Sequence, residues 1–339
     1  MLRAFYSKLK ASLDRRAKRR HRPGHDGHGS ASDVEHVFKK RRYRGSRDRE
    51  YLVHLPPTYD RRRKLPVVMI LHGCDQDHHA IRHVSNFDRV ADEHGIIVVY
   101  PFVTSYDAPR GKNCWAFWSR SENRAGAGEV EDLWQILRSV RAGYKADANR
   151  LHVAGLSSGA GMAIALLVSR CDKIASGAQI AGLAYNESPM SIGFRRAVNQ
   201  STDRIVAAMD EEMGRKKRLV PLMIVHAKRD RVVSVREAAK VRDSWARSFS
   251  VDTSKASWSE SGITKGTAWE HRRYPREGGS SAIETLLLNH RGHGWYGGRN
   301  GKYGFINAPD VSARIWQFFE SNALNSASRV GGLFGRSGG

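Results

Sequence analysis

The chain has 339 residues, of which 40% are hydrophobic and 9% aromatic, so it can bury a large core, and its length favours one mixed domain with a tail. The longest apolar runs, such as VVMIL, fall far short of the roughly 18 residues of a membrane-spanning helix, so no transmembrane segment is predicted. Three cysteines are too few for a disulfide scaffold, and the formal net charge is +23.

Nearly half of this charge lies at the amino terminus, where residues 1–49 contain 16 Lys and Arg against 5 Asp and Glu. We interpret residues 1–33 as a basic, disordered arm and linker, and we expect residues 1–49 to be attracted to an anionic surface such as lipid, polyphosphate or nucleic acid. A solvated arm with no partner is the alternative. Aromatic residues are sparse there and no nucleic-acid-binding motif is present, so we do not expect specific nucleic-acid recognition.

The folded domain is expected over residues 34–322, followed by a flexible Gly/Ser-rich tail at 323–339. Short β-type runs alternate with helical patterns, which predicts a mostly parallel central sheet with helices on both faces. The predicted strands are 51–56, 66–72, 96–101, 150–155, 175–182, 221–226 and 282–289. The predicted helices are about 82–94, 129–143, 158–170, 235–248 and 310–321.

The sharpest chemical signal is the motif Gly155-Leu156-Ser157-Ser158-Gly159, which lies between a predicted strand and a helix rich in small residues. This is the context of a nucleophile elbow, the strained turn that presents the catalytic serine of α/β-hydrolases. Glycines two positions on either side let the backbone bend without a Cβ clash. Ser157 is therefore the candidate nucleophile of an α/β-hydrolase fold.

A serine hydroxyl needs a histidine to take its proton and an acid to orient that histidine, and both are expected later in the chain. Asp230 follows a late strand, where catalytic groups gather in open α/β sheets, although a turn-forming or helix-capping role is the alternative. The Gly-rich loop after the last strand offers two histidines. We choose His293 as the base, because its glycine neighbours permit a tight loop, and leave His290 as structural.

An oxyanion hole needs two backbone N–H groups aimed at the developing negative charge. Ser158, directly after the nucleophile, supplies one, and Cys74, in the loop HGCDQ after an early strand, is the candidate for the other. Cys74 as a thiol nucleophile is the rejected alternative, since a serine elbow is already present. Trp115, Trp118 and Trp295 are candidates to line an apolar substrate pocket, Trp295 above all because it is two residues from the base, and core packing is the alternative for Trp118.

With these residues in hand, the chain resembles the esterase family of polyhydroxybutyrate (PHB) depolymerases, whose relatives include feruloyl and acetylxylan esterases. The resemblance covers about residues 48–300. It rests on several motifs in the same order: LHGCDQ (71–76), ADEHGIIVVYP (91–101), the Cys-Trp pair at 114–115, GAGEVEDL (126–133), AGLSSGAGMA (154–163), HAKRDRVV (226–233) and GHGWYGG (292–298).

The resemblance places the family's nucleophile, acid and base on Ser157, Asp230 and His293, and its oxyanion donors on Cys74 and Ser158. It also implies a disulfide between Cys74 and Cys114, since family members have cysteines at both positions. Members typically carry a signal peptide, which implies an extracellular location. Here charges interrupt each apolar stretch of residues 1–22, so no cleavable signal peptide is predicted, and a cytoplasmic or granule-associated protein is the alternative.

The predicted function is hydrolysis of a carboxylic ester in two acyl-transfer steps, with no metal or organic cofactor required. Short-chain polyhydroxyalkanoate or its oligomers are the expected substrate, and feruloyl or acetyl esters on plant polysaccharide are the alternative. A hypothesis of another class is a catalytically weak protein that binds anionic surfaces or nucleic acid through its basic arm. The intact candidate triad argues against it.

Overall fold

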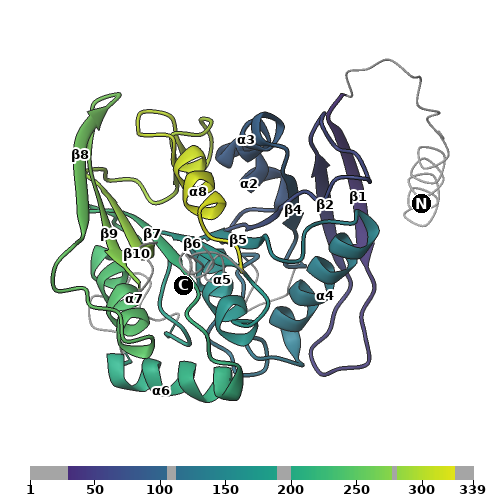
Figure 1. Cartoon of the computed structure of the whole chain (residues 1–339), viewed down its shortest axis with the longest axis horizontal. Helices are drawn as coiled ribbons and strands as arrows, with labels where there is room; N and C mark the ends of the chain where they lie inside the picture. The colour runs from purple at the N-terminus through teal and green to yellow at the C-terminus, as the bar shows by residue number, and fades with distance from the viewer. Residues whose placement is uncertain (1–29, 105–111, 189–199, 277–280, 325–339) are drawn as a thin grey trace, which may run out of the picture.

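The computed structural model describes residues 30–104, 112–188, 200–276 and 281–324, and its framework is a sheet of ten strands in the order β1-β2-β4-β3-β5-β6-β7-β10-β9-β8 (Figure 1). The six inner strands from β4 to β10 are parallel to one another, and an antiparallel pair flanks them on each side. The inner strands are β4 (Ile97–Pro101), β3 (Val67–Leu71), β5 (Leu151–Leu156), β6 (Ser176–Ile180), β7 (Leu222–Ala227) and β10 (Ser281–Leu288). The outer strands are β1 (Ser32–Phe38), β2 (Arg49–Leu55), β8 (Trp258–Thr264) and β9 (Thr267–Pro275).

Helices cover both faces of the sheet, and each face has its own hydrophobic core (Figure 1). One face packs against α4 (Gly128–Gly143), α5 (Ser158–Ser169), α6 (Thr202–Met213) and α7 (Val235–Ser248). The other packs against α2 (His78–Ser85), α3 (Phe87–His94) and α8 (Val311–Glu320). A strand buried on both faces must be apolar at every position, which is why β3 reads VVMIL with all five residues buried. The predicted α/β-hydrolase architecture is confirmed.

All seven predicted strands and all five predicted helical segments are present, with one difference in the helices. The segment predicted as a single helix over 82–94 is two helices, α2 and α3, which meet at Asn86. Asn86 has a φ of 49°, a left-handed conformation that asparagine tolerates better than most residues, and the chain turns there. Strands β1, β8 and β9 and helix α6 were not predicted, nor were the two-residue strands β11 (Trp295–Tyr296) and β12 (Gly304–Phe305) and the short 3₁₀ helix Gly214–Lys216.

The described fold extends slightly beyond both predicted boundaries of the domain. Strand β1 begins at Ser32, two residues before the predicted start at 34, and at the other end the N–H of Leu324 donates to the carbonyl of Asn149. Most of the predicted basic arm, residues 1–29, and the tail from 325 lie outside the described residues. Within the described part of the chain, no helix has both the length and the apolar character needed to cross a membrane.

Candidate active site

Ser157 lies on a sharp turn between β5 and α5, at the centre of the sheet. Its φ of 56° and ψ of −118° are a conformation that a residue with a side chain rarely adopts. The strain is held by hydrogen bonds on both sides of the turn: Ser157 N–H donates to the carbonyl of Ile180, and its own carbonyl accepts from Ala160 and Gly161. A strained backbone conformation that is held in place by surrounding hydrogen bonds is typical of a functional position.

Two glycines make this turn sterically feasible. A Cβ on Gly155 would lie 2.3 Å from the carbonyl oxygen of Gly159, and a Cβ on Gly159 would lie 2.3 Å from the carbonyl oxygen of His72. Neither neighbour can move, because both are backbone atoms of buried elements. The G-x-S-x-G spacing therefore follows from close packing of the turn against β3 and α5.

Asp230 and His293 come from loops after β7 and β10, which are adjacent parallel strands, so both loops leave the same edge of the sheet. The Nδ1 atom of His293 lies 2.8 Å from Oδ2 of Asp230. The Asp230 side chain is fully buried, and His293 is 8% exposed. An ionised carboxylate can only accept, so Nδ1 carries the proton and Nε2 keeps a lone pair.

The environment of Asp230 keeps its carboxyl group ionised. Burial by itself raises the pKa of Asp230, but the hydrogen bond from His293 and the N–H groups of Val232 and Val233 outweigh it and hold the pKa below its ordinary value. His226, buried in β7, shapes the same loop: its Nε2 donates to the carbonyl of Val233 and lies 3.8 Å from Oδ2 of Asp230. Sequence reasoning assigned no role to His226, since a histidine inside a hydrophobic strand resembles core.

His290 is built into its own loop. Its Nδ1 accepts the N–H of Gly292, and its ring packs against Phe305 with centroids 4.7 Å apart. Its position agrees with the structural interpretation of this histidine and leaves His293 as the residue of the pair that contacts Asp230.

A short series of contacts connects Ser157 with the histidine loop. The Cβ of Ser157 lies 3.3 Å from the Cβ position of Gly73, at the start of loop 73–76. Gln76 accepts the N–H of Gly73 through Oε1 and donates through Nε2 to the carbonyl of Lys302 at 3.4 Å. The neighbouring Tyr303 packs its ring edge against His293, with centroids 6.1 Å apart. Sequence reasoning missed Gln76 and Tyr303, because only the fold brings Gln76 next to Lys302, which is 226 positions further along the chain.

Loop 73–76 is held by a disulfide and by a buried histidine. Cys74 and Cys114 form a disulfide, as the resemblance implied. The buried His72 accepts the N–H of Val103 at Nε2 and therefore donates from Nδ1 to the carbonyl of Gly73. Burial lowers the pKa of His72 to about 4, so this ring stays neutral. The loop is thus rigid next to the serine, as donors to an oxyanion must be.

The other candidate donor, the Ser158 N–H, belongs to the first turn of α5, whose amides have no partner within the helix. The positive end of the helix dipole lies at this turn and favours an anion there. Ser158 follows the strained residue directly, and Cys74 follows Gly73, whose Cβ position is next to Ser157. The two predicted donors therefore flank the serine on separate elements.

Two of the three candidate tryptophans lie elsewhere than predicted. Trp115 has no exposed surface, and its indole N–H donates to the carbonyl of His72. Trp295 is also fully buried and donates to Oγ of Ser312. Each indole has found a polar partner inside the core, as buried tryptophans usually do. Side chains without exposed surface cannot line a substrate pocket in this structure, and both indoles are core residues instead.

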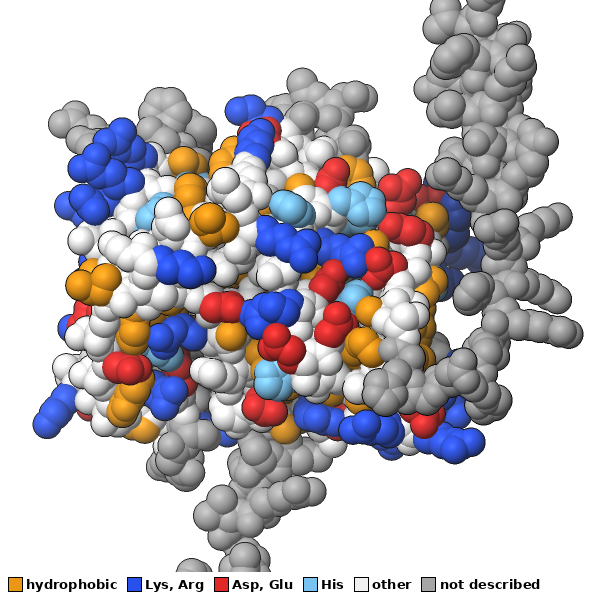
Figure 2. Space-filling view, turned by 90° about the horizontal axis from the view of Figure 1, so that it is seen from above, with side chains coloured by type: hydrophobic (Ala, Val, Ile, Leu, Met, Phe, Trp, Pro, Cys, Tyr) orange, Lys and Arg blue, Asp and Glu red, His pale blue; other side chains and the backbone are white. Residues whose placement is uncertain are grey.

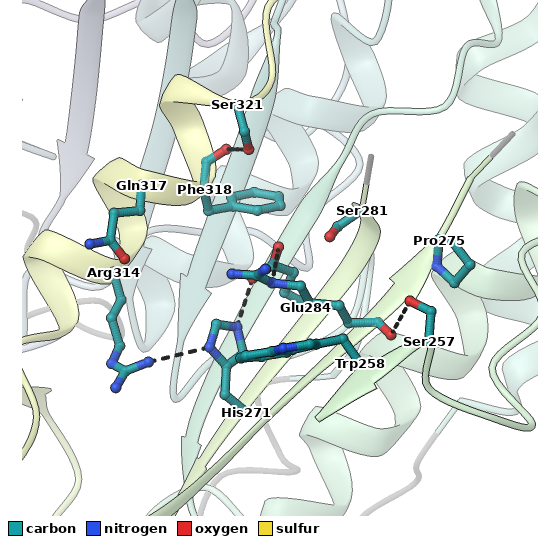
Figure 3. Close-up of a pocket in the computed structure, with 11 residues that line it drawn as sticks. Ser257, Trp258, His271, Pro275, Ser281, Glu284, Arg314, Gln317, Phe318 and Ser321 are labelled. Atoms are coloured by element: carbon teal, nitrogen blue, oxygen red, sulfur yellow. Dashed lines mark hydrogen bonds and ion pairs between the residues drawn. The ribbon is translucent and has the colours of Figure 1, made fainter. Parts of the chain in front are cut away.

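The hollow drawn in Figure 3, with a volume of about 350 Å³, lies away from Ser157. It opens between α8 and strands β8–β10, near the start of β10, and His271 and Glu284 point toward one another in it (Figure 3). None of the predicted site residues lines it. A hollow by itself does not locate the chemistry, which needs a nucleophile and its partners.

Comparison with known proteins finds a family of esterases and individual esterases to which this chain is similar. The family model described as Esterase PHB depolymerase matches residues 49–260. Poly(3-hydroxyalkanoate) depolymerase C of Paucimonas lemoignei is 24% identical over 234 residues, which are 68% of this chain and 55% of the relative. Feruloyl esterase B of Neurospora crassa is 25% identical over 209 residues, 57% of this chain and 68% of the relative. The chain thus spans about half of the length of the depolymerase it matches.

Among solved structures, an acetyl xylan esterase from Aspergillus awamori superposes with a TM-score of 0.60 at 18% sequence identity, covering 78% of this chain and 94% of that one. At this identity the likeness concerns the fold. The sheet and its helices have the same architecture as that acetyl xylan esterase.

Proposed function

We propose that this chain, which belongs to the Esterase PHB depolymerase family, hydrolyses carboxylic esters with Ser157 as nucleophile, His293 as base and Asp230 as the acid that orients it. The observation that carries the proposal is the 2.8 Å contact of His293 with Asp230 at the sheet edge where Ser157 occupies a strained turn. The family match supports the reaction class, and the residue roles rest on this geometry.

In the first step the Oγ of Ser157 attacks the ester carbonyl carbon while Nε2 of His293 takes the hydroxyl proton. The ionised Asp230 accepts the hydrogen bond from Nδ1 and stabilises the imidazolium. The N–H groups of Cys74 and Ser158 donate to the negative oxygen of the tetrahedral intermediate. The alcohol then leaves with the proton from His293, and water releases the acid from Ser157 by the same sequence.

For the substrate, we propose a short-chain polyhydroxyalkanoate such as PHB or its oligomers. Support comes from the family model and from the depolymerase of Paucimonas lemoignei. Esters of plant polysaccharide are the second candidate, favoured by the match to a feruloyl esterase that covers 68% of that relative. The arm's attraction to an anionic surface remains a prediction from charge alone, and no comparison supports it.

The test compares wild type with Ser157→Ala on four substrates: p-nitrophenyl butyrate, amorphous PHB, methyl ferulate and acetylated xylan. Removal of the nucleophile should lower kcat/KM on every cleaved substrate by about 10⁴-fold or more. Ser169→Ala is the matched control, a buried serine at the far end of the same helix. Equal activity of wild type and Ser157→Ala would reject the nucleophile, and cleavage of the ferulate or xylan ester without PHB would move the substrate to the second candidate.

A further inference from the structure

Two consecutive histidines on the α2 face of the sheet have no part in the proposed reaction. His78 and His79 form the first turn of α2, directly after loop 73–76, and Glu35 of strand β1 lies against both. Figure 2, which looks onto the side of α2, α3 and α8, shows histidine side chains among acidic and basic ones. Segments more than forty residues apart in the chain therefore bring two imidazoles and a carboxylate together.

The three groups surround one point. One Glu35 oxygen lies 3.8 Å from Nε2 of His78, and the other lies 3.8 Å from Nε2 of His79. The ligand atoms of the three residues all lie within 4.8 Å of one another. Neither Glu35 contact is a hydrogen bond, because 3.8 Å is too long for one. The carboxylate faces both rings across gaps that a small cation would fill.

His78 is the buried member of the group, with 5% of its surface exposed. Its Nε2 is the nitrogen that faces Glu35, so Nδ1, which is buried without a hydrogen-bond partner among the described residues, lies on the other side of the ring from the proposed cation. Its ring also lies 4.1 Å, centroid to centroid, from that of His79, an arrangement unfavourable for two protonated imidazoles. Neutral rings that share a cation remove that repulsion.

The chemistry of the group fits a divalent transition cation. Imidazole nitrogens and a carboxylate oxygen bind zinc at about 2.0–2.2 Å, so the observed 3.8 Å separations need only small side-chain shifts. The positive charge nearest to the group along α2 does not oppose a cation. Arg82, one turn further along the helix, is neutralised by ion pairs with Asp33 and Asp88. Three protein ligands leave one tetrahedral position for water.

We propose that Glu35, His78 and His79 form a binding site for one Zn²⁺ ion, which cross-links strand β1 to the start of α2. The ion stabilises the fold where the amino-terminal strand meets the helix that follows loop 73–76. The site shares no residue with the proposed hydrolysis of esters. Metal binding here does not depend on the activity of Ser157.

The experiment uses the full chain, stripped with EDTA and titrated with ZnCl₂ in a calorimeter, with the thermal midpoint followed in parallel. One equivalent of Zn²⁺ should bind and raise the Tm, because a ligand that binds only the folded state stabilises it. Glu35→Gln and His79→Gln should each weaken binding by about tenfold or more. Both side chains are largely exposed, so neither change should unfold the protein.

The matched control is His83→Gln, an exposed histidine on the same helix that contacts the carbonyl of Asn300 instead. It should bind Zn²⁺ as wild type does. Ser157→Ala should also bind Zn²⁺ unchanged, which separates this site from the proposed catalytic function. Absence of binding by wild type would overturn the proposal. The proposal would also be overturned if Glu35→Gln and His79→Gln both bound Zn²⁺ as tightly as wild type. That result would assign the metal to other groups, such as the histidines of residues 1–29.

Discussion

Two buried histidine–carboxylate pairs lie at opposite ends of strand β10, and only one of them has the surroundings of a catalytic dyad. His293 and Asp230 meet beyond the carboxyl end of β10, 2.8 Å apart. His271 and Glu284 meet near its amino end, 2.6 Å apart, in the hollow of Figure 3. In both pairs the carboxyl pKa is lowered: burial raises it, but the hydrogen bond and charge of the histidine, together with the other groups around each carboxylate, outweigh burial.

The surroundings of the two pairs differ. His293 shares its edge of the sheet with the strained Ser157 and the start of helix α5. Glu284 is also approached by Arg273 at 3.3 Å, and His271 is contacted by the Arg314 guanidinium at 3.4 Å and by the edge of the Trp258 ring. In the second pair both ring nitrogens are engaged, so no lone pair is left to take a proton from a substrate.

A buried histidine that is hydrogen-bonded to a carboxylate can therefore serve the packing of the fold alone. Such a pair becomes catalytic only with further groups around it. A free imidazole nitrogen has to face a nucleophile. Backbone N–H groups have to be positioned to donate to the negative oxygen of the tetrahedral intermediate. The carboxyl edge of the sheet is where we propose that these groups meet, because loops from several parallel strands converge there. The amino-terminal half of β10 pairs with β7 and β9 and lies beside helix α8, and none of the predicted site residues lines the hollow there.

The largest expected difference between the two pairs is in activity when each histidine is replaced in turn. His293→Gln removes the proposed base and should lower kcat/KM on p-nitrophenyl butyrate by about 10⁴-fold or more. His271→Gln should leave kcat/KM within about twofold and lower the Tm instead, because it breaks a buried hydrogen bond. Steady-state kinetics and thermal melts of both variants check this. A large loss of activity in His271→Gln with an unchanged fold would refute the distinction.

The carboxylates give the next largest contrast. Asp230→Asn keeps the shape but donates a hydrogen bond where one must be accepted, so Nδ1 loses its proton, and kcat should fall by about 10³–10⁴-fold. Glu284→Gln should keep kcat and destabilise the fold by about 1–3 kcal/mol, because it leaves Arg273 and His271 without their anionic partner. Urea denaturation and initial rates measure the two effects. Similar kcat losses in both variants would show that the two pairs are not functionally distinct.

The smallest expected effect is a pH dependence of stability at the second pair. The folded-state pKa of Glu284 is lowered from its ordinary value of 4.5, so this carboxylate contributes stability above that value and loses it as the pH falls through the lowered pKa. The difference in unfolding free energy between wild type and Glu284→Gln should therefore be full at pH 7 and shrink between about pH 5 and pH 3. Urea titrations across this range test it, and a difference that grows on acidification would contradict the assignment.

Local patterns of the sequence were sufficient for the centre of the fold. A strand buried on both faces must be apolar throughout, so runs such as those of β3 and β7 are visible without a structure. The edge hairpin β8–β9 was missed because β8 is mostly exposed and polar, and the two-residue turn at Lys265 and Gly266 was not recognised. Strand β1 was missed for the same reason, since it alternates exposed and half-buried residues within a charged segment.

The sequence by itself determined the chemical types of the proposed site: a serine in a glycine-framed turn, then an acid and a histidine after late strands. Local sterics and chain order encode these features, so they can be read one motif at a time. Only the tertiary structure decided which histidine meets Asp230, and that Trp115 and Trp295 are buried supports. It also decided that Gln76 joins Gly73 to Lys302. These contacts depend on strand order and loop packing, which bring together residues that no local pattern relates.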